Sequence, residues 1–188
     1  VKRIYKQVHF NFNDKLNTMK KITFFTITIL LLVGQMTFAQ GFEIPKNVHL
    51  EKKSDYTKYE PAVLNGIKWL EQTNVEEQLV KRENISAFVL QWIMGTPSFS
   101  IGLQTFQLKL TKKNPELMLS FLGGWTKFAI ENPSEKENAI KANIAGFQSL
   151  IKVYTANKGH GMKKDKKIEK LIKLNSLEFE KWVRKEVE

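Results

Sequence analysis

Lysine is concentrated in one segment near the carboxyl end of the chain, residues 158–173. This segment contains two acidic residues and seven lysines, which are Lys158, Lys163, Lys164, Lys166, Lys167, Lys170 and Lys173. Clustered ammonium groups attract phosphates through a salt-sensitive interaction that does not depend on sequence. Lys163, Lys164, Lys166 and Lys167 are therefore candidate ligands for a polyanion such as lipopolysaccharide, nucleic acid or an acidic protein. The alternative is an ordinary solvated helix face, because apolar residues alternate with these lysines at helical spacing.

Residues for nucleophilic, acid–base or metal chemistry are few. The chain has no cysteine, which excludes a disulfide scaffold, a thiol nucleophile and a cysteine-ligated metal site. His160 lies between two glycines and could act as an exposed ligand or a base, although a solvated loop histidine is the more common case. Glu76 and Glu77 are adjacent, so on a helix they point in different directions. The sequence therefore predicts no catalytic residue, metal site or cofactor.

The four tryptophans could line a ligand groove or fill the core; they are Trp69, Trp92, Trp125 and Trp182. All four fall on or beside the apolar faces of the expected helices. Aromatic side chains bury large areas of apolar surface, so core packing is the favoured interpretation.

An export signal precedes the part of the chain that holds these groups. Met19 is followed by two lysines, by an apolar run over residues 22–33, and by small residues three and one positions before Gln40. This pattern is typical of a secretory signal peptide that is cleaved after Ala39. A membrane anchor is the alternative, but residues 22–38 span only about 25 Å as a helix, and a bilayer core measures about 30 Å.

The chain thus divides into four regions: an upstream extension ahead of the biological start (1–18), the signal peptide (19–39), an N-terminal arm (40–53) and a helical domain (54–188). Cleavage would release the mature protein into the periplasm or the medium, without a stable transmembrane anchor. It would also lower the net charge from +11 to +6, because residues 1–39 hold six basic residues and one acidic residue. The lysine-rich segment carries most of the positive charge that remains.

Apolar periodicity predicts an all-α domain. Apolar side chains recur at three- and four-residue spacing through most of the mature chain, and start and stop signals divide them. We expect a compact bundle of five or six helices, over about residues 54–72, 77–94, 102–113, 115–129, 135–157 and 164–187. The second of these has apolar residues all round its second half, which predicts burial on two sides. Residues 98–103 also alternate like a strand, so an extended start is expected there.

Several residues are expected to start or end these helices. Asn114 before Pro115 fits a capping side chain followed by proline at the first helical position. Ser134 with Glu137 three residues later matches a capping box. Gly159 suits the position just after a helix end, where a left-handed backbone is common.

Small residues predict a close contact between two helices. Gly123 and Gly124 interrupt a strongly apolar helix, and each should cost about 1 kcal/mol relative to alanine. A bend or a close neighbouring backbone would account for them. Gly146 belongs to a face of mostly small residues on the helix expected at 135–157, and small residues let helix axes approach.

One part of the sequence resembles a group of known proteins. The motifs are Asn-Pro-Glu-Leu at 114–117, Gly-Gly-Trp-Thr-Lys-Phe-Ala at 123–129 and a leader that ends Phe-Ala-Gln at 38–40. With these motifs the chain resembles small exported helical proteins of Gram-negative bacteria that have no assigned function, over about the middle third of the mature chain. The resemblance implies an envelope location and carries over no activity and no site residue.

Together these observations favour a non-enzymatic exported module that binds or supports a protein or another envelope component. A binder of polyanions through the lysine-rich segment is the first alternative. An enzyme whose carboxylates converge only on folding, with His160 as its base, is the second.

Overall fold

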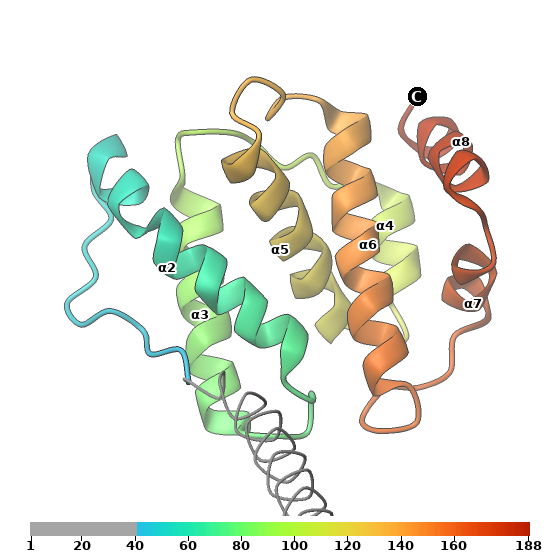
Figure 1. Cartoon of the computed structure of the whole chain (residues 1–188), viewed down its shortest axis with the longest axis horizontal. Helices are drawn as coiled ribbons and strands as arrows, with labels where there is room; N and C mark the ends of the chain where they lie inside the picture. Colours follow the sequence, from blue (N-terminus) through green and yellow to red (C-terminus); the bar gives the residue numbers. More distant parts are fainter. Residues whose placement is uncertain (1–40) are drawn as a thin grey trace, which may run out of the picture. The chain divides into compact units, whose positions relative to one another are not determined.

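Seven helices make up the described part of the chain. The structure is a computed structural model that describes residues 41–188, and the expected upstream extension and signal peptide lie outside the described residues. The helices, labelled as in Figure 1, are α2 (Lys53–Gln72), α3 (Leu79–Gly95), α4 (Thr105–Thr111), α5 (Glu116–Glu131), α6 (Ala139–Asn157), α7 (Lys166–Ile172) and α8 (Ser176–Val187). No strand is assigned within residues 41–188, so the expected all-α class is confirmed. No helix in this range has both the length and the apolar character that crossing a bilayer requires.

Helices α5 and α6 lie side by side at the centre of this unit and make its most extensive helix–helix contact (Figure 1). A Cβ atom on Gly124 would lie 2.5 Å from the carbonyl oxygen of Ala145 and 2.9 Å from the Cα of Gly146. A Cβ atom on Gly146 would lie 2.7 Å from the ring of Phe121. All three distances are too short for a side chain, so the expected close backbone contact is confirmed.

The other helices flank this pair. Helix α2 contacts α3 and α5, and α8 contacts α6 (Figure 1). The N-terminal arm reaches α2 without forming a helix and ends at its first turn, Lys53. Residues 98–104 are extended or bent before α4 begins at Thr105, as the alternating pattern indicated.

Aromatic side chains fill the space on both sides of the central pair. Phe147 has its ring centroid 4.8 Å from that of Phe121 and 5.2 Å from that of Trp182. Trp92 is fully buried, and its indole Nε1 donates a hydrogen bond of 3.0 Å to the carbonyl oxygen of Tyr56. Core packing therefore holds for Trp92 and Trp125, which are buried, whereas Trp69 and Trp182 are only half-buried.

Two expected helix caps are wrong. The side chain of Asn114 does not cap α5; its Nδ2 donates to the carbonyl oxygen of Lys163 at 2.9 Å, and its Oδ1 accepts from the Lys163 N–H at 2.8 Å. Helix α6 begins after Asn138, whose Oδ1 accepts from the N–H of Lys141 at 3.1 Å, and Ser134 lies in the preceding turn. Asn114 thus has a partner distant in the sequence, whereas Asn138 makes the local cap that was expected from Ser134.

The helix expected over residues 164–187 is two helices. The helix is interrupted between α7 and α8, and Asn175 caps α8 in a capping box with Glu178. The Oδ1 of Asn175 accepts from the N–H of Glu178 at 3.0 Å, and the N–H of Asn175 donates to Oε2 of Glu178 at 3.1 Å. This cap stabilises a new helix start, so apolar periodicity continues across the break while the backbone turns. The expected burial of α3 on two sides is also wrong, because Ala87 is exposed and Met94 is 82% exposed.

The contact between α5 and α6 predicts a strong effect of a single methyl group. We expect Gly124→Ala to lower the free energy of unfolding by about 1–3 kcal/mol, because overpacking against backbone atoms outweighs the better helix propensity of alanine. Urea unfolding measures this. Gly102→Ala is the control, since a Cβ there meets no atom within 4 Å. Equal stability of the two variants would contradict the close contact.

Candidate functional site

The lysine-rich segment runs from the end of α6, through a loop, into α7. Lys163 and Lys164 lie in the loop, Lys166 and Lys167 lie in the first turn of α7, and all four side chains are exposed. The backbone of the loop is held by two hydrogen bonds between the Asn114 side-chain amide and Lys163. The Nζ of Lys113 also donates to the carbonyl oxygen of Lys164. The four candidate lysines are therefore held on a defined backbone but are divided between a loop and a helix.

A network of hydrogen bonds neutralises part of this segment. The Tyr154 hydroxyl accepts from the N–H of Asp165 at 2.8 Å and donates to Oε1 of Glu169 at 3.0 Å. Lys158 forms a salt bridge of 2.9 Å with the same oxygen. The side chain of Asp165 caps α7 by accepting from the N–H of Lys167. Both acids of the segment are thus used structurally, and within residues 41–188 Lys158 is the one lysine of the segment in a salt bridge.

This network shifts the ionisation of its members. The hydrogen bond from Lys158, followed by the one from Tyr154, lowers the pKa of Glu169 below its ordinary value. The same bond raises the pKa of Lys158. Burial raises the pKa of Tyr154. The ion pair of Lys158 and Glu169 is therefore fully charged at neutral pH.

A basic groove lies next to the segment, between α4, α7 and α8. It has a volume of ≈ 390 Å³ and is lined by Phe106, Lys109, Leu110, Lys167, Lys170, Leu171, Leu174, Trp182 and Glu186. Only Lys167 belongs to the four lysines singled out from the sequence. Lys109 comes from α4, and no sequence pattern connects it with α7.

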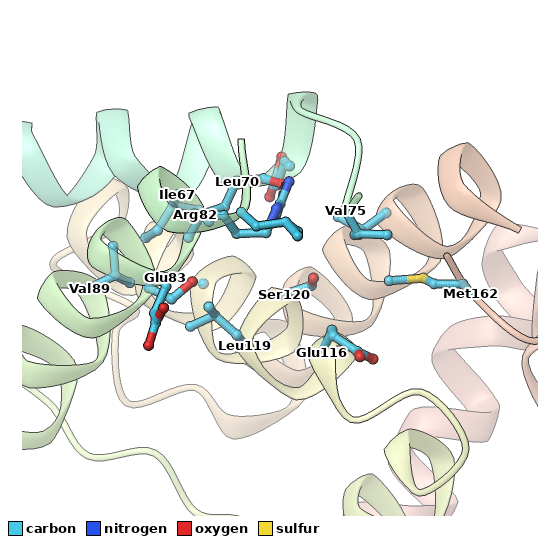
Figure 2. A pocket seen from close by; sticks show the side chains of 15 residues that line it. Ile67, Leu70, Val75, Arg82, Glu83, Val89, Glu116, Leu119, Ser120 and Met162 are labelled. Atoms are coloured by element: carbon cyan, nitrogen blue, oxygen red, sulfur yellow. Dashed lines mark hydrogen bonds between the residues drawn. The ribbon is translucent and has the colours of Figure 1, made fainter. Parts of the chain in front are cut away.

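A second hollow, the α2–α3–α5 pocket, has a volume of ≈ 370 Å³. Its lining residues are Ile67, Leu70, Glu71, Val75, Leu79, Arg82, Glu83, Ser86, Val89, Glu116, Leu119, Ser120, Gly123, Val153 and Met162. Figure 2 shows Ile67, Val89 and Leu119 on one side of it and Val75 and Met162 on the other. The pocket is therefore formed by apolar side chains from several helices together with six polar ones, which are Glu71, Arg82, Glu83, Ser86, Glu116 and Ser120.

The loop residues of this pocket are held by one buried amide. Asn157, the last residue of α6, accepts from the N–H of Val75 at 2.9 Å through its side-chain oxygen. Its backbone carbonyl accepts from the N–H of Met162 at 3.3 Å. Gly159, as expected after the helix end, has a positive φ of 84°, which lets the chain return toward Met162. Val75 and Met162 are therefore positioned by the end of α6.

Two charged side chains of the pocket have protein partners. The Arg82 guanidinium donates to the carbonyl oxygens of Leu70, Thr73 and Asn74, which closes the end of α2, and burial lowers its pKa. Glu71 accepts from the Ser149 hydroxyl at 2.6 Å and pairs with Lys152 at 2.7 Å. These two residues stabilise the walls of the pocket.

The contacts with Glu71 involve two residues, Ser149 and Lys152, whose spacing is not among the sequence predictions. Ser149 and Lys152 form a Ser-x-x-Lys pattern, which in some hydrolases supplies a nucleophile and a base. Here Ser149 is buried, and Lys152 is an ammonium paired with Glu71. The pair joins α6 to α2 and has no reactive geometry.

The candidate acid–base residues are outside the lining of this pocket. His160 is exposed in the turn after α6, and His49 is exposed in the arm. The turn of His160 lies against the loop after α2, because a Cβ atom on Gly161 would be 2.7 Å from the Cγ of Glu76. Across residues 41–188 no group of three or more histidine or acidic side chains could hold a metal ion.

Comparison of the chain with protein-family models, with curated proteins and with solved structures gives no match. The resemblance to exported helical proteins therefore remains a prediction from the motifs alone.

The Glu169 network predicts a specific pH dependence of stability. Because the pKa of Glu169 is lower in the folded protein, its carboxylate stabilises the fold above its ordinary pKa, and this contribution is lost as the pH falls through the folded value. We expect Glu169→Gln to reduce the urea midpoint at pH 7 and to make a progressively smaller difference as the pH falls below the ordinary glutamate pKa of 4.5. Glu131→Gln, at an exposed position, is the control. The difference in urea midpoint between this variant and the parent protein should be the same at every pH. A Glu169→Gln deficit that is constant with pH would contradict the role of ionisation.

Proposed function

We propose that the chain is an exported helical binding module of the cell envelope, and that the α2–α3–α5 pocket holds its ligand. The observation that carries this proposal is the lining of the pocket, in which apolar residues are the majority and six polar residues lie among them. Its volume of ≈ 370 Å³ lies in the range of small-molecule sites, which are commonly built this way between the helices of a bundle. The ligand class is a small, largely apolar molecule.

The polar groups of the pocket favour binding over catalysis. Arg82 and Glu71 are committed to protein partners, as described above. Glu83 and Glu116 are exposed, and in Figure 2 their carboxylates point away from the middle of the pocket. Ser86 and Ser120 supply hydroxyl groups, which can donate to or accept from a ligand. This arrangement supports recognition of an apolar body that carries one or two polar atoms.

Support for the export part of the proposal comes from the leader at residues 19–39. The periplasm or the cell exterior is the location that we propose. An apolar ligand fits this location, because envelope components are rich in apolar groups. The carboxylate-dependent enzyme remains the alternative, and it would require Glu83 and Glu116 to act together on a substrate.

Filling the pocket should weaken binding without unfolding the protein. We expect the uncharged dye N-phenyl-1-naphthylamine to bind with a rise in fluorescence, and Ser120→Leu to weaken that binding at least about tenfold, because the larger side chain occupies the hollow. Ser134→Leu adds the same side chain at an exposed turn and should leave the dissociation constant unchanged. Circular dichroism verifies the fold of both variants. Unchanged dye binding by folded Ser120→Leu would contradict the pocket assignment.

Export is tested at the amino terminus. When the full gene is expressed in a Gram-negative host, protein from a periplasmic extract should begin at Gln40. Ala39→Arg places a large charged residue directly before the cut and should cause uncleaved protein to accumulate. Full-length parent protein confined to the cytoplasm would contradict export.

A further inference from the structure

We propose that the basic groove between α4, α7 and α8 binds a single-chain amphiphile with an anionic head group. In this assignment the head group lies against Lys109, Lys167 and Lys170, and the alkyl chain lies along the apolar floor of the groove. The site is separate from the α2–α3–α5 pocket, since the two hollows have no lining residue in common.

The floor of the groove is an apolar surface that the fold leaves open. The break after α7 turns the chain so that Leu174 and Trp182 come beside Phe106 of α4. The rings of Phe106 and Trp182 lie 6.2 Å apart, nearly perpendicular, and both residues are only half-buried. Trp182 is fixed from behind by Phe147 and Phe179, with centroid distances of 5.2 and 6.0 Å. The floor is thus rigid and offers aromatic and aliphatic contact to a ligand.

The rim of the groove is positively charged. Lys167 and Lys170 are three residues apart on α7 and share one face of that helix, and Lys109 reaches the groove from α4. None of these three lysines forms a salt bridge in the part of the chain that the structure describes. Glu186 is the one acidic residue in the lining, so the rim has a net charge of about +2 at neutral pH. An anionic head group is complementary to this rim.

The combination of floor and rim distinguishes an amphiphile from a plain polyanion. A polyanion needs exposed cations but no apolar surface. Lys163, Lys164 and Lys166 are exposed cations of that kind and lie outside the lining of the groove. The groove lysines, in contrast, border a hollow of ≈ 390 Å³ that an alkyl chain can enter. Carboxylate and phosphate head groups both match the rim, so a free fatty acid and a phosphate-bearing lipid share the required chemistry.

Binding is tested by isothermal titration calorimetry on the full chain, residues 1–188, with probes kept below their micelle concentrations. Laurate and dodecyl phosphate should bind saturably; dodecyltrimethylammonium, with the opposite charge, and inorganic phosphate, without a chain, should bind at least about tenfold more weakly. In the series octanoate, decanoate and laurate, affinity should rise by up to about fourfold per methylene. Preference for laurate supports a free carboxylate, and preference for dodecyl phosphate supports a lipid phosphate. Absence of saturable binding by both overturns the proposal.

Two matched triple variants locate the site. Lys109→Gln/Lys167→Gln/Lys170→Gln removes three charges from the rim and should weaken both anionic probes at least about tenfold. Lys163→Gln/Lys164→Gln/Lys166→Gln removes three charges outside the groove and should change the affinity less than about twofold. Equal losses in the two variants overturn the proposal, because they indicate general electrostatic attraction. Retention on heparin that falls equally in both variants, without affinity for the amphiphiles, would instead identify a plain polyanion binder.

A covalent probe gives a second readout that does not depend on the lysine variants. A laurate analogue with a diazirine on its chain should label peptides from α4 and α8 after irradiation, and an excess of unmodified laurate should suppress the labelling. Labelling that falls on the α2–α3–α5 pocket or on residues 1–40 overturns the assignment to the groove.

Discussion

The backbones of α5 and α6 meet at Gly124 and Gly146, and the positions of the other helices depend on this contact. Because glycine has no side chain, the two helix axes can approach until Phe121 covers Gly146 and the Ala145 carbonyl lies over Gly124. Because densely packed side chains transmit small displacements, a shift of α5 relative to α6 would also move the helices that pack on either side of them. Helix α2 packs on one member of the pair and α8 on the other, so each hollow is bordered by elements that this contact positions.

Local patterns in the sequence were enough to predict the helical class, the close contact at Gly124 and the turn at Gly159. The helical class and the turn at Gly159 depend on residues that are near one another in the chain, and the close contact was indicated by small residues on each of the two helices. The break between α7 and α8 was missed because apolar spacing continues through residues 173–175 while the Asn175 cap starts a new helix. Asn114 was misassigned for a related reason, since its amide is used by a backbone distant in the sequence.

The candidate sites were less predictable than the fold. Lysine clustering drew attention to Lys163, Lys164, Lys166 and Lys167, yet of these four only Lys167 lines the basic groove. Lys109, which faces the same groove, is isolated in the sequence, and only the packing of α4 beside α7 and α8 reveals it. The α2–α3–α5 pocket is a similar case, because its apolar residues have the same periodicity as ordinary core residues. A cavity between packed side chains cannot be predicted from the sequence pattern of the helices that form it.

The two hydrogen bonds between the Asn114 amide and the backbone of Lys163 have a mechanical consequence. They fasten the chain just after α4 to the chain just before α7, and these two helices carry the lysines on either wall of the groove. The separation of the walls at that end is therefore constrained by the Asn114 carboxamide together with the hydrogen bond from the Nζ of Lys113 to the carbonyl oxygen of Lys164.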